Sequence, residues 1–479
     1  VALLLAAAVT LPIIPREALR PDDASRPALR LLLALAVTVG PTFVLLATTG
    51  PLLQRWFATA HAGRSPYPLY AVSNAGSLLA LLTYPVLVEP LFGLRAQSWA
   101  WSAGYVAFAL ACAALAWRSL RGARGAEPAH GEGAAVPPEP RPGVRRMAAW
   151  VALPAIATML LMATTNQVTQ DIASVPLLWV IPLAIYLLTF ILCFSSDRAY
   201  DPPIFSITLV VALVYSVYLL QRPALPLGFH VLFSGSLVFF GCMSLHGETA
   251  RLKPGPAHLT LFYLLIAFGG ALGGVFVGLV APVLFEGFWE YHLALWLTPA
   301  LVLTAQFAGG RPDLRLAGGA ALGLVVLGGV LVTQVQRRSE DVIFRERNFY
   351  GVVRVIERPS ASSEHILRTL EHGRIVHGIQ RTDPAHARAP LAYYTPDSGI
   401  GVTFAQLPPA DQEEIRVGVI GLGAGVIASY AQPGEAWVFY EIDPLVTEVA
   451  ERYFTYLRDA RDRGATVEVR HGDARLVLE

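Results

Sequence analysis

Three glycines near the end of the chain, Gly421, Gly423 and Gly425, stand at alternate positions after a short apolar run, in the segment VIGLGAG. Because glycine lacks a side chain, this spacing allows a tight turn and lets a ligand lie against backbone amides. At the N-terminus of a helix such a turn suits nucleotide-type ligands, since the helix dipole is positive there. We therefore expect a strand over residues 416–420 and a helix that begins near Val426. The alternative is a Rossmann-like sheet in which the turn is only structural.

Two acidic residues follow the next predicted strands. Glu441 ends AWVFYE, 20 residues after Gly421, and Asp473 follows TVEVRH. The carboxyl ends of parallel strands meet at one sheet edge, where an acid at this distance can accept hydrogen bonds from ribose hydroxyls. Val426 stands where a dinucleotide fold often has its third glycine. The pattern therefore favours an S-adenosyl-type ligand over NAD.

These motifs require a soluble α/β domain, which the composition places after residue 336. Residues 337–414 predict a small β subdomain with hairpins in RTLEHGRIVHGIQ and PLAYYTPDSGIGVTF, because both segments combine glycine with β-branched residues and the second adds aromatic residues. Residues 415–479 predict a partial Rossmann-like domain that is C-terminally truncated, since the chain stops within the alternating pattern.

The rest of the chain predicts a multi-pass α-helical membrane domain. Of its 479 residues, 54% are hydrophobic and 15% charged, against about 25% charged in soluble domains. A bilayer is spanned by about 20 apolar residues. Ten runs approach that length, and the opening run 1–15 predicts the end of another: 28–50, 68–92, 97–117, 147–165, 175–194, 203–221, 224–246, 258–285, 291–309 and 315–335. The lipid bilayer is thus an expected partner, and the net charge of +1 gives no reason to expect nucleic acid.

A Pro-, Gly- and Arg-rich segment, 118–146, predicts a flexible basic linker between two helical halves, 1–117 and 147–336. Residues 67–90 and 259–286 resemble each other, as in transporters built from parallel six-helix halves, although chance similarity between apolar helices is the alternative. Within the second segment, Gly270, Gly274 and Gly278 predict a helix-packing face.

Polar residues in or beside these helices are further candidates, because an uncompensated charge in a bilayer is costly. Two interpretations are open: these residues line a polar cavity, or they lie in interfacial loops that face water. The residues are Asn166, Gln167, Gln170, Asp171, His246, Glu248 and Arg251. The three cysteines, Cys112, Cys193 and Cys242, are expected to be small buried hydrophobes. No metal is expected, since the spacings of the C-terminal histidines match no short metal motif: His365, His372, His377, His386 and His471.

VIGLGAG, YEIDP and GDARL, preceded by HGIQ and YY, resemble the spermidine synthase (polyamine aminopropyltransferase) family. The specific motifs cover about residues 345–479, and the whole chain resembles membrane proteins in which such a domain follows transporter-like helices. The resemblance implies an enzyme that transfers an alkyl group other than methyl, the aminopropyl group, from decarboxylated S-adenosylmethionine to an amine such as putrescine. It allows a homodimer and implies no metal.

The resemblance also implies residue roles. The glycine turn with Glu441 would hold the co-substrate, Asp473 would contact its adenine side, and Gln380 would belong to the same site. Tyr394, or its neighbour Tyr393, would position the acceptor amine.

The chain departs from the family at two places and stops before a third. Ala424 replaces an aspartate, and Thr395 and Pro396 follow Tyr394 where the family has His and Glu. The family's catalytic aspartate follows a fourth strand, so no general base is named. Methyl transfer from S-adenosylmethionine to a membrane substrate therefore stays open, as does a polyamine-type transporter with a regulatory ligand-binding domain.

The distribution of arginines gives a weak indication of how the protein is oriented in the membrane. The six arginines of the linker lie on one side by span count, and Arg337, Arg338, Arg345 and Arg347 flank the last span on the other. Because the co-substrate is cytosolic, we expect a protein of the cell membrane with a cytoplasmic soluble domain.

Overall fold

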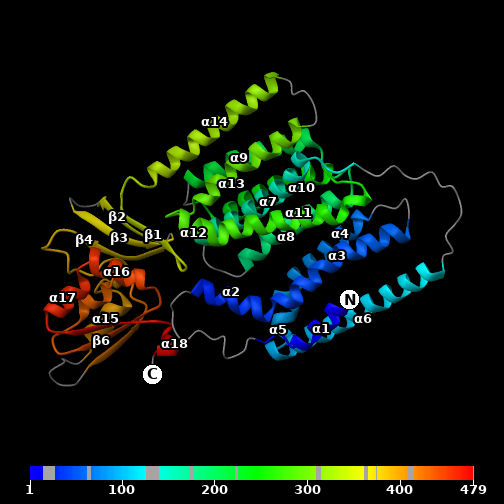
Figure 1. Cartoon of the computed structure of the whole chain (residues 1–479). Helices are drawn as coiled ribbons and strands as arrows, with labels where there is room; N and C mark the ends of the chain where they lie inside the picture. The colour runs from blue at the N-terminus through cyan, green and yellow to red at the C-terminus, as the bar shows by residue number, and fades with distance from the viewer. Residues whose placement is uncertain are drawn as a thin grey trace. The chain divides into compact units, whose positions relative to one another are not determined.

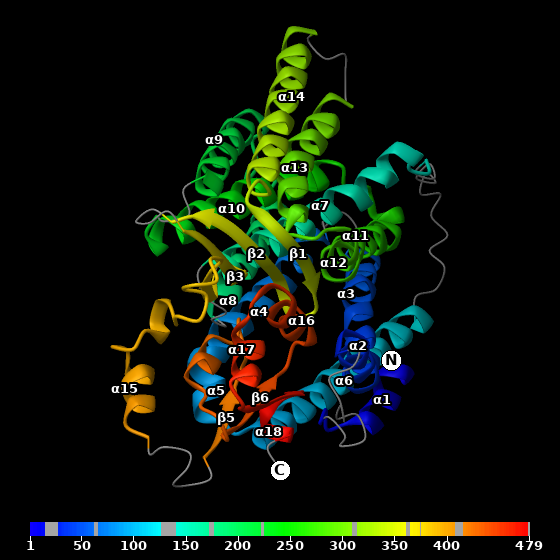
Figure 2. The same ribbon diagram turned by 90° about the vertical axis from the view of Figure 1, so that its left-hand side faces the viewer.

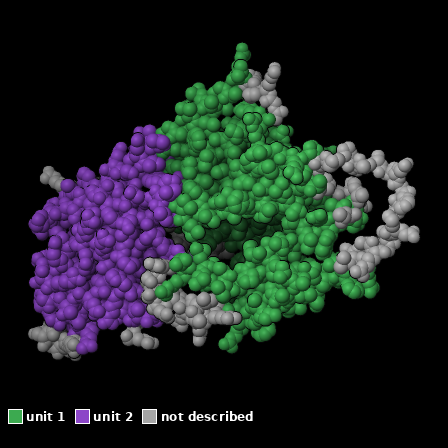
Figure 3. All heavy atoms as spheres, viewed as in Figure 1, with its two compact units in different colours: residues 1–20, 29–281, 290–331 green, residues 21–28, 282–289, 332–479 purple. Residues whose placement is uncertain are grey.

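The computed structural model describes residues 1–14, 27–61, 66–125, 140–171, 177–221, 225–308, 314–360, 365–373, 375–407 and 415–477. The chain divides into two compact units, coloured in Figure 3. We call residues 1–20, 29–281 and 290–331 the membrane unit, and residues 21–28, 282–289 and 332–479 the C-terminal unit. The chain is mostly helical, and the described strands all belong to the C-terminal unit (Figure 1).

Among the described residues, those as far as Arg337 are mostly helical. Their bounds are α1 Ala2–Ala7, η1 Ala8–Thr10, α2 Pro27–Thr38, α3 Gly40–Ala60, α4 Tyr67–Thr83, η3 Tyr84–Val88, α5 Glu89–Leu91, α6 Leu94–Gly125, α7 Val144–Asp171, α8 Leu177–Ser195, α9 Pro202–Gln221, α10 Leu227–Arg251, η4 Pro256–His258, α11 Leu259–Val275, η5 Phe276–Val280, α12 Ala281–Leu284, α13 Trp289–Phe307 and α14 Leu314–Arg337. The two segments η3 and η5 are π-helical.

Within the described residues, eight helices are long and apolar enough to cross a bilayer, or nine spans if the bent pair α2–α3 counts as one. This indicates a membrane protein, as the composition predicts. The predicted run 28–50 is broken by a 63° bend at Val39, because Pro41 cannot donate to the carbonyl four residues earlier and its ring clashes with that carbonyl. The predicted run 291–309 forms α13 but is not among the eight, since Glu290 and His292 open it.

The opening apolar run forms the six-residue α1 and one 3₁₀ turn. One further boundary differs from expectation. The predicted linker 118–146 begins and ends inside helices, since α6 continues to Gly125 and α7 starts at Val144. Residues 126–139 lie outside the described residues.

The resemblance between residues 67–90 and 259–286 corresponds to a structural repeat. Both α4 and α11 have 17 residues, and each is followed by a five-residue π-helical segment and then a short α-helix. Pro90 and Pro282 are the second residues of α5 and α12. Proline cannot donate to the carbonyl four residues earlier, and a wider π-helical turn accommodates this loss.

The closest helix contact in the membrane unit joins α7 and α11, which lie side by side in Figures 1 and 2. A Cβ added to Gly269 would lie 2.2 Å from the Val151 carbonyl oxygen, and one on Gly273 would lie 2.2 Å from that of Ala155. Glycine at both positions therefore lets the backbones touch. The predicted face is shifted by one residue, since a Cβ on Gly270 or Gly274 would meet only side-chain atoms at 3.5 Å or more.

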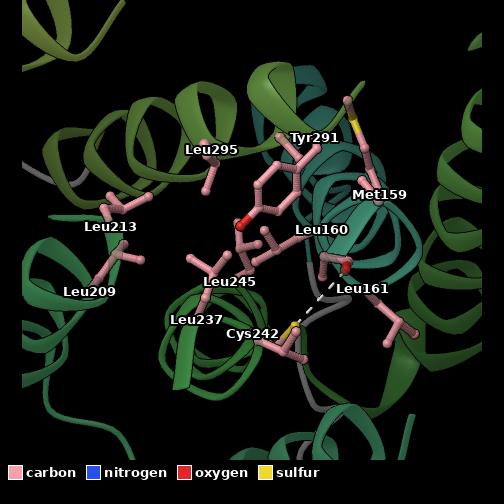
Figure 4. Packing of buried hydrophobic residues seen from close by; sticks show 14 of the residues in the cluster. Met159, Leu160, Leu161, Leu209, Leu213, Leu237, Cys242, Leu245, Tyr291 and Leu295 are labelled. Carbon is pink, nitrogen blue, oxygen red and sulfur yellow. Dashed lines mark hydrogen bonds between the residues drawn. The ribbon is translucent and has the colours of Figure 1, made fainter. Parts of the chain in front are cut away.

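The core of the membrane unit gathers α7, α9, α10 and α13 (Figure 4). Leu160, Leu237 and Leu295 are fully buried there. The Cys242 thiol points at the Ala157 carbonyl oxygen at 3.9 Å, a weak hydrogen bond. All three cysteines are buried and free, which confirms that they act as small apolar residues.

The C-terminal unit holds two small sheets, whose strands are β1 Val342–Asn348, β2 Gly351–Pro359, β3 Ile366–His372, β4 Ile375–Arg381, β5 Arg416–Ile420, β6 Ala436–Glu441 and β7 Thr466–His471. The first four form an antiparallel sheet in the order β1-β2-β3-β4, and the last three form a parallel sheet in the order β5-β6-β7. The helical segments are η6 Ala392–Tyr394, α15 Gly399–Ala405, η7 Val426–Tyr430, α16 Pro444–Tyr453, α17 Tyr456–Asp462 and α18 Ala474–Val477.

One hydrophobic core joins these two sheets. Val353 and Leu370 of the antiparallel sheet pack in the same cluster as Trp437 and Phe439 of the parallel sheet. This continuous core fixes the position of each sheet against the other, as a site built from both of them requires.

Two local predictions in this unit are wrong. The second predicted hairpin is instead η6 followed by α15, because the Ser398 hydroxyl accepts a hydrogen bond from the Gly401 amide and caps a helix. The helix expected after the glycine turn is only the 3₁₀ turn η7, which is too short to carry a helix dipole.

Candidate functional site

A cleft of about 460 Å³ lies in the C-terminal unit, between the carboxyl edge of the parallel sheet and the antiparallel sheet (both sheets are labelled in Figure 2). Its lining combines acids, histidines, tyrosines and the glycine turn: Tyr350, Val353, Leu370, His372, His377, Tyr393, Tyr394, Val419, Ile420, Gly421, Leu422, Gly423, Glu441, Ile442, Asp443 and Val446.

The glycine turn has the backbone that the sequence predicts. Gly421, Gly423 and Gly425 have φ values of +88°, +55° and +76°, a region that side chains disfavour. A Cβ on Gly423 would also lie 2.6 Å from the His377 carbonyl oxygen, so the turn approaches β4 closely. Around Gly421 nothing lies within 4 Å of an added Cβ, and this glycine faces open space.

The amides of this turn are mostly engaged within the chain. Leu422 donates to the Glu441 carboxylate, Ala424 to the His377 carbonyl and Gly425 to the Leu422 carbonyl, at 2.9, 3.2 and 3.0 Å. The Gly421 amide donates to the Tyr440 carbonyl at 2.8 Å. The turn therefore offers a ligand an open surface next to Gly421, and less of the amide cradle expected from the sequence.

Glu441 connects the glycine turn to the end of β6. Its side chain is 7% exposed; Oε2 accepts from the Leu422 amide and Oε1 accepts from the Asp443 amide at 3.0 Å. Each carboxylate oxygen has two lone pairs, so each can accept one more hydrogen bond. Glu441 can thus hold the turn and also receive two hydroxyl groups of a ligand.

Asp443 is the residue that the sequence motifs did not single out. It is 2% exposed, and its Oδ1 caps α16 by accepting from the Leu445 amide and also accepts from the Asn348 amide group. Its Oδ2 is buried and has no hydrogen-bond partner among the described residues. The Asp-Pro pair at 443–444 indicates a helix cap, but only the tertiary structure reveals the unsatisfied oxygen beside the cleft.

Two tyrosine side chains form another part of the cleft lining. The rings of Tyr393 and Tyr394 lie 4.5 Å apart, and Tyr394 packs on the core while Tyr393 is exposed. Burial, aided by Tyr393, raises the pKa of Tyr394 to about 12, so its hydroxyl stays protonated. Ala392 before them has a φ of +59°, a left-handed conformation that costs about 1–2 kcal/mol.

Two histidines and a tyrosine complete the cleft. Burial, with the neighbouring His372, lowers the pKa of His377, so this imidazole is neutral at physiological pH. Burial also raises the pKa of Tyr350, and the carboxylates of Asp443 and Glu441 add to that effect. Glu441 and Asp443 are the acidic side chains among the described lining residues, which include no Lys or Arg.

Three residues expected at the site lie outside the cleft lining. The Gln380 carboxamide bonds to the Ala387 carbonyl and to Thr455. Asp473 lies at the correct sheet edge, but Arg475 binds its carboxylate and holds its pKa at about 2. Gly425 precedes η7 and packs near Leu457.

The membrane unit contains a second polar cluster. The Glu248 carboxylate, 2% exposed, accepts from the Tyr200 hydroxyl at 2.8 Å and from Arg251 at 3.0 Å. His246 is fully buried, with Nδ1 2.9 Å from the Thr189 hydroxyl and its ring 3.7 Å from that of Phe190. His246 and Glu248 thus do not face water in a loop. The α7 helix continues through Asp171, and the side chains of Gln170 and Asp171 are outside the described residues.

No model of a known protein family matches the chain, and neither does any curated protein or solved structure. The chemistry of the cleft itself therefore has to carry the functional argument.

Proposed function

We propose that the C-terminal unit is a Rossmann-like, spermidine synthase-like transferase, which moves an aminopropyl group from decarboxylated S-adenosylmethionine to an amine such as putrescine. The observation that carries this proposal is the charge of the cleft. Its described lining contains two buried carboxylates, Glu441 and Asp443, and no basic side chain with a permanent charge.

Buried carboxylates need compensation, because desolvation costs several kcal/mol for each unpaired ion. A sulfonium ligand with a ribose supplies both a positive charge and two hydroxyl donors. An acceptor amine adds further positive charge before it reacts. A dinucleotide would instead bring an anionic pyrophosphate toward Glu441 and Asp443, and the engaged amides of the glycine turn offer it little compensation.

The topology supports the same proposal. The order β5-β6-β7 agrees with half of a doubly wound sheet, in which the glycine turn follows the first strand and the acid ends the second. Glu441 pairs with His471 at the last position of the β6–β7 ladder, so the strands end together. The ligand would then lie outside the carboxyl ends of these strands.

The chemistry is a single displacement. The amine lone pair forms a bond to the methylene carbon next to the sulfonium, and the carbon–sulfur bond breaks with its electron pair going to sulfur. Sulfur becomes a neutral thioether, and the new ammonium group releases its proton to solvent water at the open side of the cleft. Tyr394 remains protonated and would orient the acceptor amine.

The test uses the intact protein in lipid nanodiscs, incubated with decarboxylated or ordinary S-adenosylmethionine and a panel of amines, with products identified by mass spectrometry. We expect an amine heavier by one aminopropyl group, and none with Glu441→Ala. A methylated product would overturn aminopropyl transfer in favour of methyl transfer. No product from either co-substrate would overturn the enzymatic proposal.

Transport is a second candidate, which the repeated helix pattern of α4 and α11 and the buried Glu248 favour. In that case the membrane unit would carry polyamine-like cations, and the C-terminal unit would regulate it. Proteoliposomes should then take up labelled putrescine even with Glu441→Ala, and absence of uptake would exclude this role. For either function we propose the cell membrane as the location and the cytoplasm as the side of the C-terminal unit.

A further inference from the structure

The C-terminal unit brings together two histidines and an aspartate outside the cleft lining: His365, Asp383 and His386. The His365 Nδ1 lies 3.1 Å from Asp383 Oδ1, and the His386 Nδ1 lies 2.5 Å from Asp383 Oδ2. The two imidazole rings are 5.1 Å apart. All three ligand atoms lie within 4.8 Å of one another. From this cluster we propose a binding site for a divalent transition-metal ion, with Zn²⁺ as the expected ion.

The fold explains why the cluster forms. Leu367 pairs with Arg381 in the β3–β4 ladder, so His365 and Asp383 occupy the next facing positions on the same face. The Thr382 amide donates to the Ile366 carbonyl at 3.0 Å and extends the pairing up to that point. A turn after Asp383 then brings back His386, whose amide donates to the Asp383 carbonyl at 3.2 Å.

The ligand set fits the chemistry of zinc. Imidazole nitrogens and a carboxylate bind Zn²⁺ at about 2.0–2.2 Å, so two ligand atoms on a tetrahedral ion lie roughly 3.3 Å apart. The distance of 3.1 Å between His365 Nδ1 and the Asp383 carboxylate is close to that spacing. The distance of 2.5 Å between His386 Nδ1 and the same carboxylate is shorter, so His386 would have to move away by about 1 Å. An imidazole that binds the ion through Nδ1 is neutral and carries its proton on Nε2.

The site is also accessible. The side chains of His365, Asp383 and His386 are 32%, 30% and 50% exposed. An ion can therefore enter, and water can fill the remaining coordination positions, as in zinc sites with three protein ligands. The competing interpretation is a His–Asp–His hydrogen-bonded cluster that binds no ion, and the two interpretations predict different titrations.

The ion would fasten the segment that leads from β4 to the tyrosines of the cleft. Contacts that already hold it include the Gln380 carboxamide on the Ala387 carbonyl and the Tyr456 hydroxyl on the Ala389 carbonyl. A metal at His386 adds a further attachment a few residues before Tyr393. The role that we propose for the ion is to hold this segment, and it does not depend on the transferase proposal.

Isothermal titration of the intact, tag-free and chelator-treated protein in zwitterionic nanodiscs with Zn²⁺ tests the proposal. We expect one equivalent to bind, and His365→Gln or His386→Gln to weaken that binding at least 10-fold, the lower limit for loss of even an outer-shell partner. His471→Gln, a matched change in the same unit, should leave the affinity unchanged, since His471 faces Thr447.

Hydrogen exchange gives a readout that does not depend on heat of binding. Zn²⁺ should slow amide exchange over residues 382–391 in the wild type and leave it unchanged in His386→Gln. No stoichiometric binding, or equal affinity in wild type and His386→Gln, would overturn the metal site.

Discussion

Replacing Asp443 by asparagine separates ligand binding from folding more cleanly than any other change in the cleft. The Asp443 Oδ1 accepts hydrogen bonds from the Leu445 amide at 3.0 Å and from Asn348 at 2.6 Å. An asparagine keeps this oxygen and remains a good helix cap. The group lost is Oδ2, which has no partner among the described residues.

The effect of Asp443→Asn on stability should therefore be smaller than its effect on ligand affinity. We expect the free energy of unfolding of Asp443→Asn to stay within about 1 kcal/mol of the wild type or to rise, since a buried unpaired charge disappears. Binding of the sulfonium ligand should weaken, because a hydrogen bond to a charged group contributes about 1.5–3 kcal/mol. That range corresponds to roughly a 10- to 150-fold loss of affinity.

Equilibrium dialysis with labelled S-adenosylmethionine, together with thermal unfolding in nanodiscs, measures both quantities. Asp443→Ala is the matched control, since it also removes the cap of α16 and should cost about 0.5–2 kcal/mol of stability. Unchanged ligand affinity in Asp443→Asn would refute the reasoning that Oδ2 faces the ligand. Equal destabilisation by Asn and Ala would refute the claim that the charge is unnecessary for folding.

Three further predictions concern the turn, a cleft histidine and the helix contact. Gly421→Ala should lower the stability of the C-terminal unit by roughly 1–2 kcal/mol, from backbone strain alone. Gly423→Ala should lower it by more, because of these two positions only 423 has a Cβ that would collide with the His377 carbonyl. Thermal unfolding of both variants measures the difference. Because the folded chain lowers the pKa of His377 below its ordinary 6.5, its unfolded state binds the proton more readily. The free energy of unfolding should therefore have its full value above about pH 6.5 and decrease as the pH drops toward the pKa of His377 in the folded protein. The free energy of unfolding of His377→Gln, measured over the same pH range, should depend less on pH. Gly269→Ala should lower the apparent melting temperature in detergent while Gly274→Ala does not, and equal effects would contradict the assigned α7–α11 contact.

The sequence predicts the elements here better than their three-dimensional relations. Hydropathy locates the spans because a bilayer imposes a minimum apolar length, yet it misses the bend at Val39, which is a backbone effect. The spacing of Gly421, Gly423 and Gly425 predicts their positive φ values, because only glycine adopts them without strain.

What the sequence does not reveal is created by tertiary contacts. Gln380 matches a family motif, but in the structure its amide is committed to Ala387 and Thr455. The unsatisfied Asp443 oxygen depends on which groups surround it. His365 and His386 are too far apart in sequence for a metal motif, and the β3–β4 register brings them onto one aspartate.

A direct comparison of ligand binding tests the central claim, that two buried carboxylates select a sulfonium nucleoside. The measurement is the dissociation constant of decarboxylated S-adenosylmethionine, S-adenosylmethionine and NAD⁺ for the intact protein in nanodiscs. We predict that at least one sulfonium ligand binds, that Glu441→Ala weakens it, and that NAD⁺ binds more weakly. Tighter binding of NAD⁺, or no binding of either sulfonium ligand, would contradict the account.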